Sequence, residues 1–351
     1  MTNHHRRQFI QGSTMTALSI AMSGCLLSAG QDESILPALE TTNSNRQLFK
    51  ISLAQWSLHR TIFGANTSAN RLRGLSGDKL IDTLRNNPGY LLRGKLDPLD
   101  FPLYARQQFG IDAVEYVNTF YFGRARDHQY LTELKKRAQG EGVTSVLIMC
   151  DLEGDLGHPV QNERKKAVEN HHKWVEAAAF LGCHSIRVNA KSAGTWSQQM
   201  QLAADGLHAL AEYAEQYKIN VLVENHGGLS SHPKWLTETI KAADHQRVGS
   251  LPDFGNFRIN ATERYDNYEG VNLLMPYAGA VSAKSLDFNS LGEHTTFDYL
   301  RLMRSVVQAG YQGYVGIEYE GEHMSEDSGI RATHRLLNKV HSQLLHEMVD
   351  M

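Results

Sequence analysis

From about residue 49 onward, short apolar runs alternate with longer stretches in which apolar residues recur every three to four positions. The short runs have the length and composition of buried strands, and the longer stretches have the periodicity of amphipathic helices. The predicted strands are 50–56, 112–117, 143–150, 184–189, 219–224, 247–252, 279–284 and 314–318. The clearest predicted helices are 162–181, 197–217, 233–244, 296–309 and 328–348.

This alternation is typical of repeated βα units, in which parallel strands are covered by the helices that connect them. Eight such units close naturally into a barrel. The alternative is a doubly wound open sheet, which usually carries a glycine-rich phosphate loop after its first strand, and no G-x-G-x-x-G follows residue 56. We therefore predict an α/β fold, a (βα)8 TIM barrel, in a single domain over residues 49–351.

The first βα unit carries a long insertion, at about residues 60–100, which contains glycine, asparagine and arginine and ends near two prolines, Pro98 and Pro102. A loop of this length at the catalytic end of a barrel often forms a lid or a wall of the substrate site. A surface insertion without such a role is the alternative.

The N-terminal thirty residues differ in character from the rest. The pair Arg6-Arg7 precedes a weakly apolar run, Met15–Leu27. This arrangement resembles a twin-arginine export signal, and the run is shorter than the roughly 20 apolar residues that a membrane span needs. We expect residues 1–30 to be a signal peptide, residues 31–48 to be a flexible polar tether, and the protein to be exported or periplasmic.

Within that run, Met22-Ser-Gly-Cys25 resembles a bacterial lipoprotein box, with methionine where leucine is usual. Two outcomes stay open. Lipidation of Cys25 would anchor the mature protein to a membrane, whereas a simple signal would be cleaved near Ala29 and leave no anchor.

Composition narrows the choice of partners. The 351 residues are 41% hydrophobic and 21% charged, and the formal net charge is −3. These values are ordinary for a folded soluble domain. There is no basic run beyond the extreme N-terminus, so the chain lacks the positive surface that binding to a phosphate backbone requires. We expect a small-molecule partner and no nucleic acid, while the oligomeric state is not predictable from this sequence.

Polar residues gather where the predicted strands end, which is where barrel enzymes place their catalytic groups. A carboxylate in an apolar run such as Val221-Leu-Val-Glu224 or Val315-Gly-Ile-Glu318 is costly to bury without a countercharge or a metal. Separate structural ion pairs are one explanation. A shared site formed by Glu224, Asp253 and Glu318, from strands 5, 6 and 8, is the explanation that we favour.

Four blocks extend this argument to a family. Glu224-Asn-His-Gly-Gly228, Leu251-Pro-Asp-Phe-Gly-Asn-Phe257, Val281-Ser-Ala-Lys-Ser285 and Tyr314-Val-Gly-Ile-Glu-Tyr-Glu-Gly321 occur in this order. Together they resemble the xylose isomerase-like barrel superfamily, and more narrowly its exported sugar phosphate isomerase/epimerase-like members. The likeness spans about residues 50–345. With no phosphate-binding glycine loop, and with export expected, we predict a sugar substrate without a phosphate group.

The resemblance implies a metal site. Ketose epimerases of this superfamily hold a divalent metal with Glu, Asp, His and Glu from strands 5 to 8, which Glu224, Asp253 and Glu318 match in three positions. Ser282 stands where the histidine is expected, and a serine hydroxyl is a poor ligand compared with imidazole. Mn, Mg, Co or Zn held by three carboxylates is one expectation, with His226 as a substitute ligand. Replacement of the metal by the ammonium of Lys284 is the other.

The chemistry implied is removal of a proton next to a carbonyl, giving an enediolate, with Glu224 and Glu318 as base and acid and Lys284 stabilising the oxyanion. The residues expected to bind the sugar are His59, Arg187, Asn189, His226 and Asn256, the last in place of a substrate-contacting histidine of the family.

We therefore predict a sugar isomerase or epimerase. One alternative is a lyase or dehydratase acting on a 3-keto sugar or cyclitol, because the same proton abstraction leads to elimination when a hydroxyl lies beta to the carbanion. The other is a lipid-anchored sugar-binding protein without catalysis, to which Ser282 in place of histidine points. The endonuclease IV-like branch of the superfamily is disfavoured by that missing histidine and by the net charge.

Overall fold

The computed structural model describes residues 47–64, 74–75 and 77–349. Residue contacts divide the chain into two units, 1–47 and 48–351, and the fold described below is that of the second unit. The predicted signal peptide, Cys25 and nearly all of the predicted tether lie outside the described residues. In the part of the chain that is described, no helix is both long enough and apolar enough to cross a membrane.

Eight parallel strands form the centre of this unit. They are β1 (Lys50–Ala54), β2 (Ala113–Val117), β3 (Thr144–Met149), β4 (Ser185–Val188), β5 (Asn220–Glu224), β6 (Val248–Leu251), β7 (Val281–Ser285) and β8 (Tyr314–Tyr319). All eight predicted strands are present, with ends that differ by at most two residues. Their order in the sheet is β6-β5-β4-β3-β2-β1-β8-β7.

The two ends of this order meet, because β6 and β7 are joined through single bridges. Ser250 pairs with Ala278 and Asp253 pairs with Ser282, both in parallel. The backbone N–H of Ser282 also donates to the carbonyl of Pro252 at 2.9 Å. The eight strands therefore form a closed ring, and the predicted α/β barrel is confirmed.

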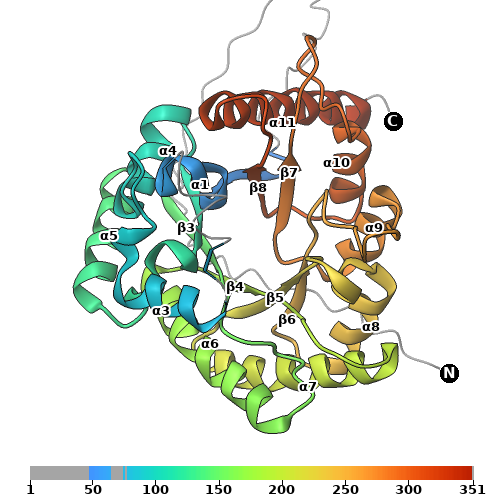
Figure 1. Ribbon diagram of the computed structural model, residues 1–351. Coiled ribbons are helices and arrows are strands. Elements are labelled where there is room, and N and C mark those ends of the chain that lie inside the picture. Colours follow the sequence, from blue (N-terminus) through green and yellow to red (C-terminus); the bar gives the residue numbers. More distant parts are fainter. Residues whose placement is uncertain (1–46, 65–73, 76, 350–351) are drawn as a thin grey trace, which may run out of the picture. The chain divides into compact units, whose positions relative to one another are not determined.

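Helices surround the strands on the outside (Figure 1). They are α1 (His59–Phe63), α3 (Asp78–Asn86), α4 (Phe101–Phe109), α5 (His128–Gly140), α6 (Gln161–Leu181), α7 (Trp196–Glu215), α8 (Pro233–Ala243), α9 (Asn267–Leu274), α10 (Tyr299–Gln308) and α11 (Glu326–Val349). Short 3-10 segments are η1 (Gln55–Leu58), η2 (Pro88–Tyr90), η3 (Pro98–Asp100), η4 (Asn118–Arg124), η5 (Gly228–Ser231) and η6 (Met275–Tyr277). The five predicted helices correspond to α6, α7, α8, α10 and α11.

Local sequence determines where these helices begin and end. Thr195 and Gln198 form a capping box at the start of α7, in which each side chain binds the other residue's backbone N–H. Gly182 ends α6 with a φ of 86°, a left-handed conformation that glycine adopts at little cost. Such signals define the ends of these helices, after which the chain returns to the barrel as the next strand.

The core lies between strands and helices, where apolar side chains such as Val223, Trp174 and Trp235 are fully buried. The strands are covered on their outer face by helices and on their inner face by one another. Every residue of β2 and β7 is buried, including Glu115 and Lys284. The interior of the barrel therefore holds charged groups that need partners within it.

The insertion at residues 60–100 is partly helical where it is described. It contains α3 and η2, and its Leu84 and Leu91 are fully buried. The N–H of Gly94 donates to the carbonyl of Ile62 at 2.9 Å, and a Cβ at Gly94 would lie 1.9 Å from the Thr61 carbonyl oxygen. This part of the insertion packs closely against the start of the barrel. Its predicted role as a lid or a wall stays a prediction.

Candidate active site

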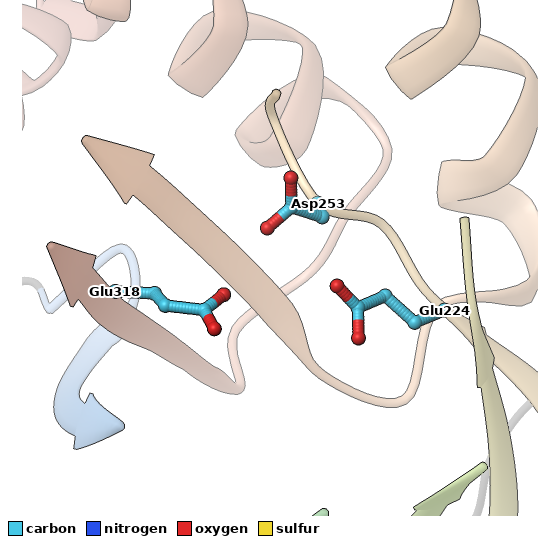
Figure 2. A group of neighbouring side chains, drawn as sticks. All are labelled: Glu224, Asp253 and Glu318. Atoms are coloured by element: carbon cyan, nitrogen blue, oxygen red, sulfur yellow. The ribbon is translucent and has the colours of Figure 1, made fainter. Parts of the chain in front are cut away.

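Three buried carboxylates converge inside the C-terminal end of the barrel. Glu224 closes β5, Asp253 follows β6, and Glu318 lies in β8. Their exposed fractions are 2%, 0% and 4%, and one carboxylate oxygen from each lies within 4.8 Å of the other two. Figure 2 shows the three groups pointing toward one another. The structure thus brings together the residues that the sequence assigned to one site.

Asp253 is held by its own loop and by β7. One carboxylate oxygen accepts the backbone N–H groups of Gly255 and Asn256, at 2.8 and 2.9 Å. The other lies 2.7 Å from the hydroxyl of Ser282. Asn225 fixes the backbone here, because its side chain donates to the Asp253 carbonyl and accepts from the Asp253 N–H. Burial, and then the neighbouring glutamates, raise the pKa of Asp253 well above its usual range.

Glu224 is held by a cation and an amide. The Arg187 Nε lies 2.7 Å from one oxygen of Glu224, and the Asn256 side chain donates to the other at 2.9 Å. Arg187 also donates to Asp151 at 2.8 Å. Burial alone would raise the pKa of Asp151, but the guanidinium of Arg187 lowers it. Arg187, on β4, therefore links the carboxylate of Asp151, which follows β3, to that of Glu224 at the end of β5.

Lys284 lies among the remaining acids. Its ammonium nitrogen is 3.3 Å from Glu318, 3.2 Å from Glu320 and 3.7 Å from Asp253. Burial would lower the pKa of this ammonium, but the surrounding carboxylates raise it well above its usual value. Burial likewise acts to raise the pKa of Glu318, and Lys284 with the Ser282 hydroxyl outweighs it, so the pKa is lowered. A fixed positive charge therefore faces an ionised Glu318.

A cavity of about 470 Å³ opens beside this group, and four of the residues that line it are His226, Asn256, Lys284 and Glu320. The ring of His226 lies 2.9 Å from the side-chain oxygen of Asn189. Three of the expected sugar-binding residues, Asn189, His226 and Asn256, are therefore linked to the carboxylate cluster or to its cavity. The volume suits a ligand of sugar size.

His59 lies elsewhere. Its Nδ1 is 2.8 Å from the carbonyl oxygen of Trp56 and 3.5 Å from a carboxylate oxygen of Glu326, and its ring stacks on that of Trp56. Among the described residues it makes no recorded contact with the three carboxylates. Its predicted contact with a sugar stays a prediction, and its observed partners are those of a residue that joins α1 to α11.

Several residues of the site were not selected from the sequence as site residues. Ser282 lies between Asp253 and Glu318, 2.8 Å from the latter, although its sequence position only marked a missing histidine. The signal was available, because Ser282 and Lys284 alternate along β7 and so face the same side. Asn225 and Asp151 act through contacts between loops, for which a single sequence has no signal.

The donor set fits a divalent cation. Three carboxylates from separate strands are the ligands that Mg²⁺ and Mn²⁺ prefer, and Ser282 adds a weak neutral oxygen between two of them. The ion pairs of the site join five carboxylates, those of Asp151, Glu224, Asp253, Glu318 and Glu320, to only two cations, Arg187 and Lys284. Glu224, Asp253 and Glu318 are the buried members of this set, and a bound cation would offset the burial and mutual repulsion of their carboxylates, which raise the pKa of Asp253. His226 is not part of the converging ligand group that the described residues form.

Comparison with known proteins agrees with the barrel fold. The family model described as xylose isomerase-like TIM barrel matches residues 103–340. Comparison with the curated proteins finds no significant sequence match.

Among solved structures, a 3-keto-D-glucoside 4-epimerase from E. coli superposes with a TM-score of 0.55 at 17% identity, over 69% of this chain and 94% of that one. L-ribulose 3-epimerase gives 0.61 at 12% identity, over 86% and 97%. A protein of Mycobacterium smegmatis solved in complex with magnesium gives 0.57 at 16% identity, over 84% and 97%. At these identities the likeness establishes the fold.

Proposed function

Because the chain belongs to the xylose isomerase-like TIM barrel family, we propose that it is an isomerase or epimerase that removes a proton next to the carbonyl of a carbohydrate. The observation that carries this proposal is the convergence of Glu224, Asp253 and Glu318, from three strands, beside the Lys284 ammonium. The solved structures of similar fold include sugar epimerases, which supports the same chemistry. Binding a sugar without reaction does not require three converging buried carboxylates.

In the proposed reaction Glu318 is the base. Its ion pair with Lys284 keeps it ionised, and its carboxylate takes a proton from the carbon next to the substrate carbonyl. The electron pair of the broken C–H bond forms a C=C bond, and the carbonyl oxygen becomes an enolate oxygen. The Lys284 ammonium donates a hydrogen bond to this oxygen and stabilises its charge. A divalent cation such as Mn, Mg, Co or Zn, when held by Glu224, Asp253 and Glu318, would polarise the same carbonyl.

The fate of the proton separates the two outcomes. In epimerisation, Glu224 holds a proton at the start and delivers it to the opposite face of the same carbon. In isomerisation, Glu318 returns its proton to the former carbonyl carbon, while the hydroxyl proton of the neighbouring carbon passes to the former carbonyl oxygen, so no acid on the opposite face is needed. Arg187 and Asn256 hold Glu224 in place for the first of these roles.

The experiment is exchange of substrate hydrogen with D2O, using the full-length chain with ketohexoses and a 3-keto glucoside. When the reaction is epimerisation, we expect wild type to form the epimer with deuterium at the reacting carbon, and Glu224→Gln, which lacks the acid on the opposite face, to form no epimer. Loss of water from the product would identify a lyase instead. Elemental mass spectrometry on the same sample measures the metal content. The absence of exchange with every sugar would contradict the proposal and favour the binding protein.

We also propose export, on the basis of the Arg6-Arg7 motif. Cell fractionation should find the chain outside the cytoplasm, and the double change Arg6→Lys/Arg7→Lys should retain it inside. Fatty-acid labelling that disappears in Cys25→Ala would identify a lipid anchor, whereas release of an unlabelled chain would indicate cleavage near Ala29.

A further inference from the structure

The loop between β6 and α9 contains a short hairpin that places two arginines opposite each other. Arg258 and Arg264 form an antiparallel bridge. Below it the N–H of Tyr265 donates to the carbonyl of Phe257 at 2.9 Å, and at the tip the Asn260 side chain accepts backbone N–H groups. Directly opposed residues of such a pair have Cβ atoms about 4.5–5.5 Å apart. The hairpin therefore starts two arginine side chains from adjacent positions.

The hairpin is anchored to the barrel. Phe257 is fully buried, and a Cβ added at Gly270 of α9 would lie 2.2 Å from its ring. Glycine at this position therefore leaves room for Phe257 at the base of the hairpin. The packing of Phe257 against α9 therefore fixes the base of the hairpin that carries the two arginines.

The positive charge of the arginine pair is not compensated. Among the described residues, neither guanidinium has a recorded hydrogen bond or ion pair. The three acids nearest in sequence are used elsewhere: Glu263 accepts from Asn260, Asp266 caps α9, and Glu269 accepts from Tyr265. Like charges placed directly opposite each other in a sheet are destabilising. Both side chains are exposed, so solvent screens much of this repulsion and the guanidinium groups remain accessible to an anionic ligand.

Both arginines line the cavity of about 470 Å³ that also reaches Asn256 and Lys284. Glu320 is the one acid among the residues that line it, and it is already paired with Lys284 at 3.2 Å. The cavity therefore has a positive side at the hairpin and a catalytic side at Lys284. A ligand that spans it would present one end to the arginines and the other to Lys284, which lies 3.3 Å from the proposed base Glu318.

We infer that the substrate is an acidic carbohydrate, whose carboxylate or phosphate group is bound by Arg258 and Arg264. The planar guanidinium forks match the paired oxygens of either group. This inference rests on the proposed function, because it assigns the other end of the same molecule to Glu318 and Lys284. A phosphate group would revise our expectation of a sugar without phosphate, which rested on the missing glycine-rich loop and on the predicted export, whereas a carboxylate group would agree with it.

The test is binding without turnover. D-glucuronate, D-glucose 6-phosphate and D-glucose share one ring and differ at carbon 6, so calorimetry with the full-length chain isolates the effect of the acidic group. We expect one of the two acidic sugars to bind at least about tenfold more tightly than glucose, the effect of one charged hydrogen bond. The double variant Arg258→Gln/Arg264→Gln should lose this preference, and the identity of the tighter acid distinguishes carboxylate from phosphate.

The control is Arg335→Gln, which removes the same charge from an exposed position on α11. The inference would be overturned if wild type bound all three sugars with equal affinity. It would also be overturned if Arg335→Gln lost the preference for the acidic sugar as fully as the double variant does. If the double variant fails to fold by circular dichroism, Arg258→Lys serves in its place, because it keeps the charge and removes the fork. Selective binding without deuterium exchange would leave the acid-binding pair standing and would contradict the proposed function alone.

Discussion

Two buried glutamates inside the same barrel have pKa values shifted in opposite directions, so that Glu115 stays protonated while Glu318 is ionised. Glu115 on β2 and Glu318 on β8 are both almost fully buried. Burial raises the pKa of Glu115 to about 8, and the Ser52 hydroxyl, at 2.6 Å, and the more distant Arg187 offset only part of this rise. The pKa of Glu318 is lowered, because Lys284 and Ser282 outweigh its burial. A cation within 3.3 Å thus separates an acid that stays neutral from one that is ready to act as a base.

The two glutamates lie in successive layers of the barrel. Ser52 pairs with Gly316 in the sheet, and Glu115 fills the space in front of Gly316, where a Cβ would lie 2.5 Å from its carboxylate. Glu318 is two residues farther along β8, toward the end that carries the cavity. The layer nearer the start of the strands is therefore closed by a neutral acid, and the next layer holds the reactive one.

The largest expected effect comes from Glu318. We expect Glu318→Gln to lower deuterium exchange by about 10²–10⁴-fold, the usual contribution of a general base. Glu115→Gln is the matched control and should leave exchange nearly unchanged. Mass spectrometry of the sugar after incubation in D2O measures both. Equal losses in the two variants would mean that the layers do not differ in function.

Replacing Lys284 tests whether its ammonium is the reason that Glu318, unlike Glu115, is ionised. Replacement by methionine leaves Asp253 and Glu318 without their cation, so we expect stability to fall by about 3–5 kcal/mol. Urea denaturation measures the loss. Millimolar Mg²⁺ or Mn²⁺ should restore part of it if the carboxylates hold a cation, while Lys339→Met, at an exposed ion pair with Glu293, should change little. A fully stable Lys284→Met would contradict the electrostatic account.

Glu115 predicts a pH dependence of stability. Below pH 4.5, its ordinary pKa, the carboxyl is protonated in both the folded and the unfolded chain. As pH rises from there to about 8, the unfolded chain releases a proton that the folded chain keeps, so this group progressively lowers stability. Each pKa unit corresponds to about 1.4 kcal/mol, which makes the total a few kcal/mol.

Glu115→Gln removes this contribution. The difference in stability between Glu115→Gln and wild type should shift in favour of the variant from pH 5 to pH 9. Urea denaturation midpoints of both proteins at the two pH values measure this difference. Parallel curves for the two proteins would show that Glu115 is ionised in the folded state.

Gly316 gives the smallest expected effect. A methyl group at this position collides with the Glu115 carboxylate, so Gly316→Ala should cost about 1–3 kcal/mol. The double variant with Glu115→Ala should recover most of that loss, since the space is then free. Thermal unfolding of the single and double variants gives the coupling, and additive losses would place the strain elsewhere.

Much of this architecture follows from the sequence. The eight strands were predictable because parallel strands covered on both sides are short apolar runs, and the helices α6, α7, α8, α10 and α11 because their apolar positions repeat with helical period. The helices α1, α3, α4 and α9 were missed, since segments of five to nine residues carry too few periods, and α5 was missed although it has 13 residues. The three carboxylates of the site were predictable as a group. A carboxylate at the end of one apolar strand is already unusual, and three such strands indicate a shared site.

By itself the sequence determined the barrel and the group Glu224, Asp253 and Glu318, because both depend on patterns along single strands. Only the tertiary structure decided which acids are paired. Lys284 reaches Glu318 and Glu320, and Arg187 joins Asp151 to Glu224, across strands far apart in the chain. It likewise brought the arginine hairpin to the cavity. Coulomb interactions depend on distance in space, and a sequence does not state those distances until the barrel closes.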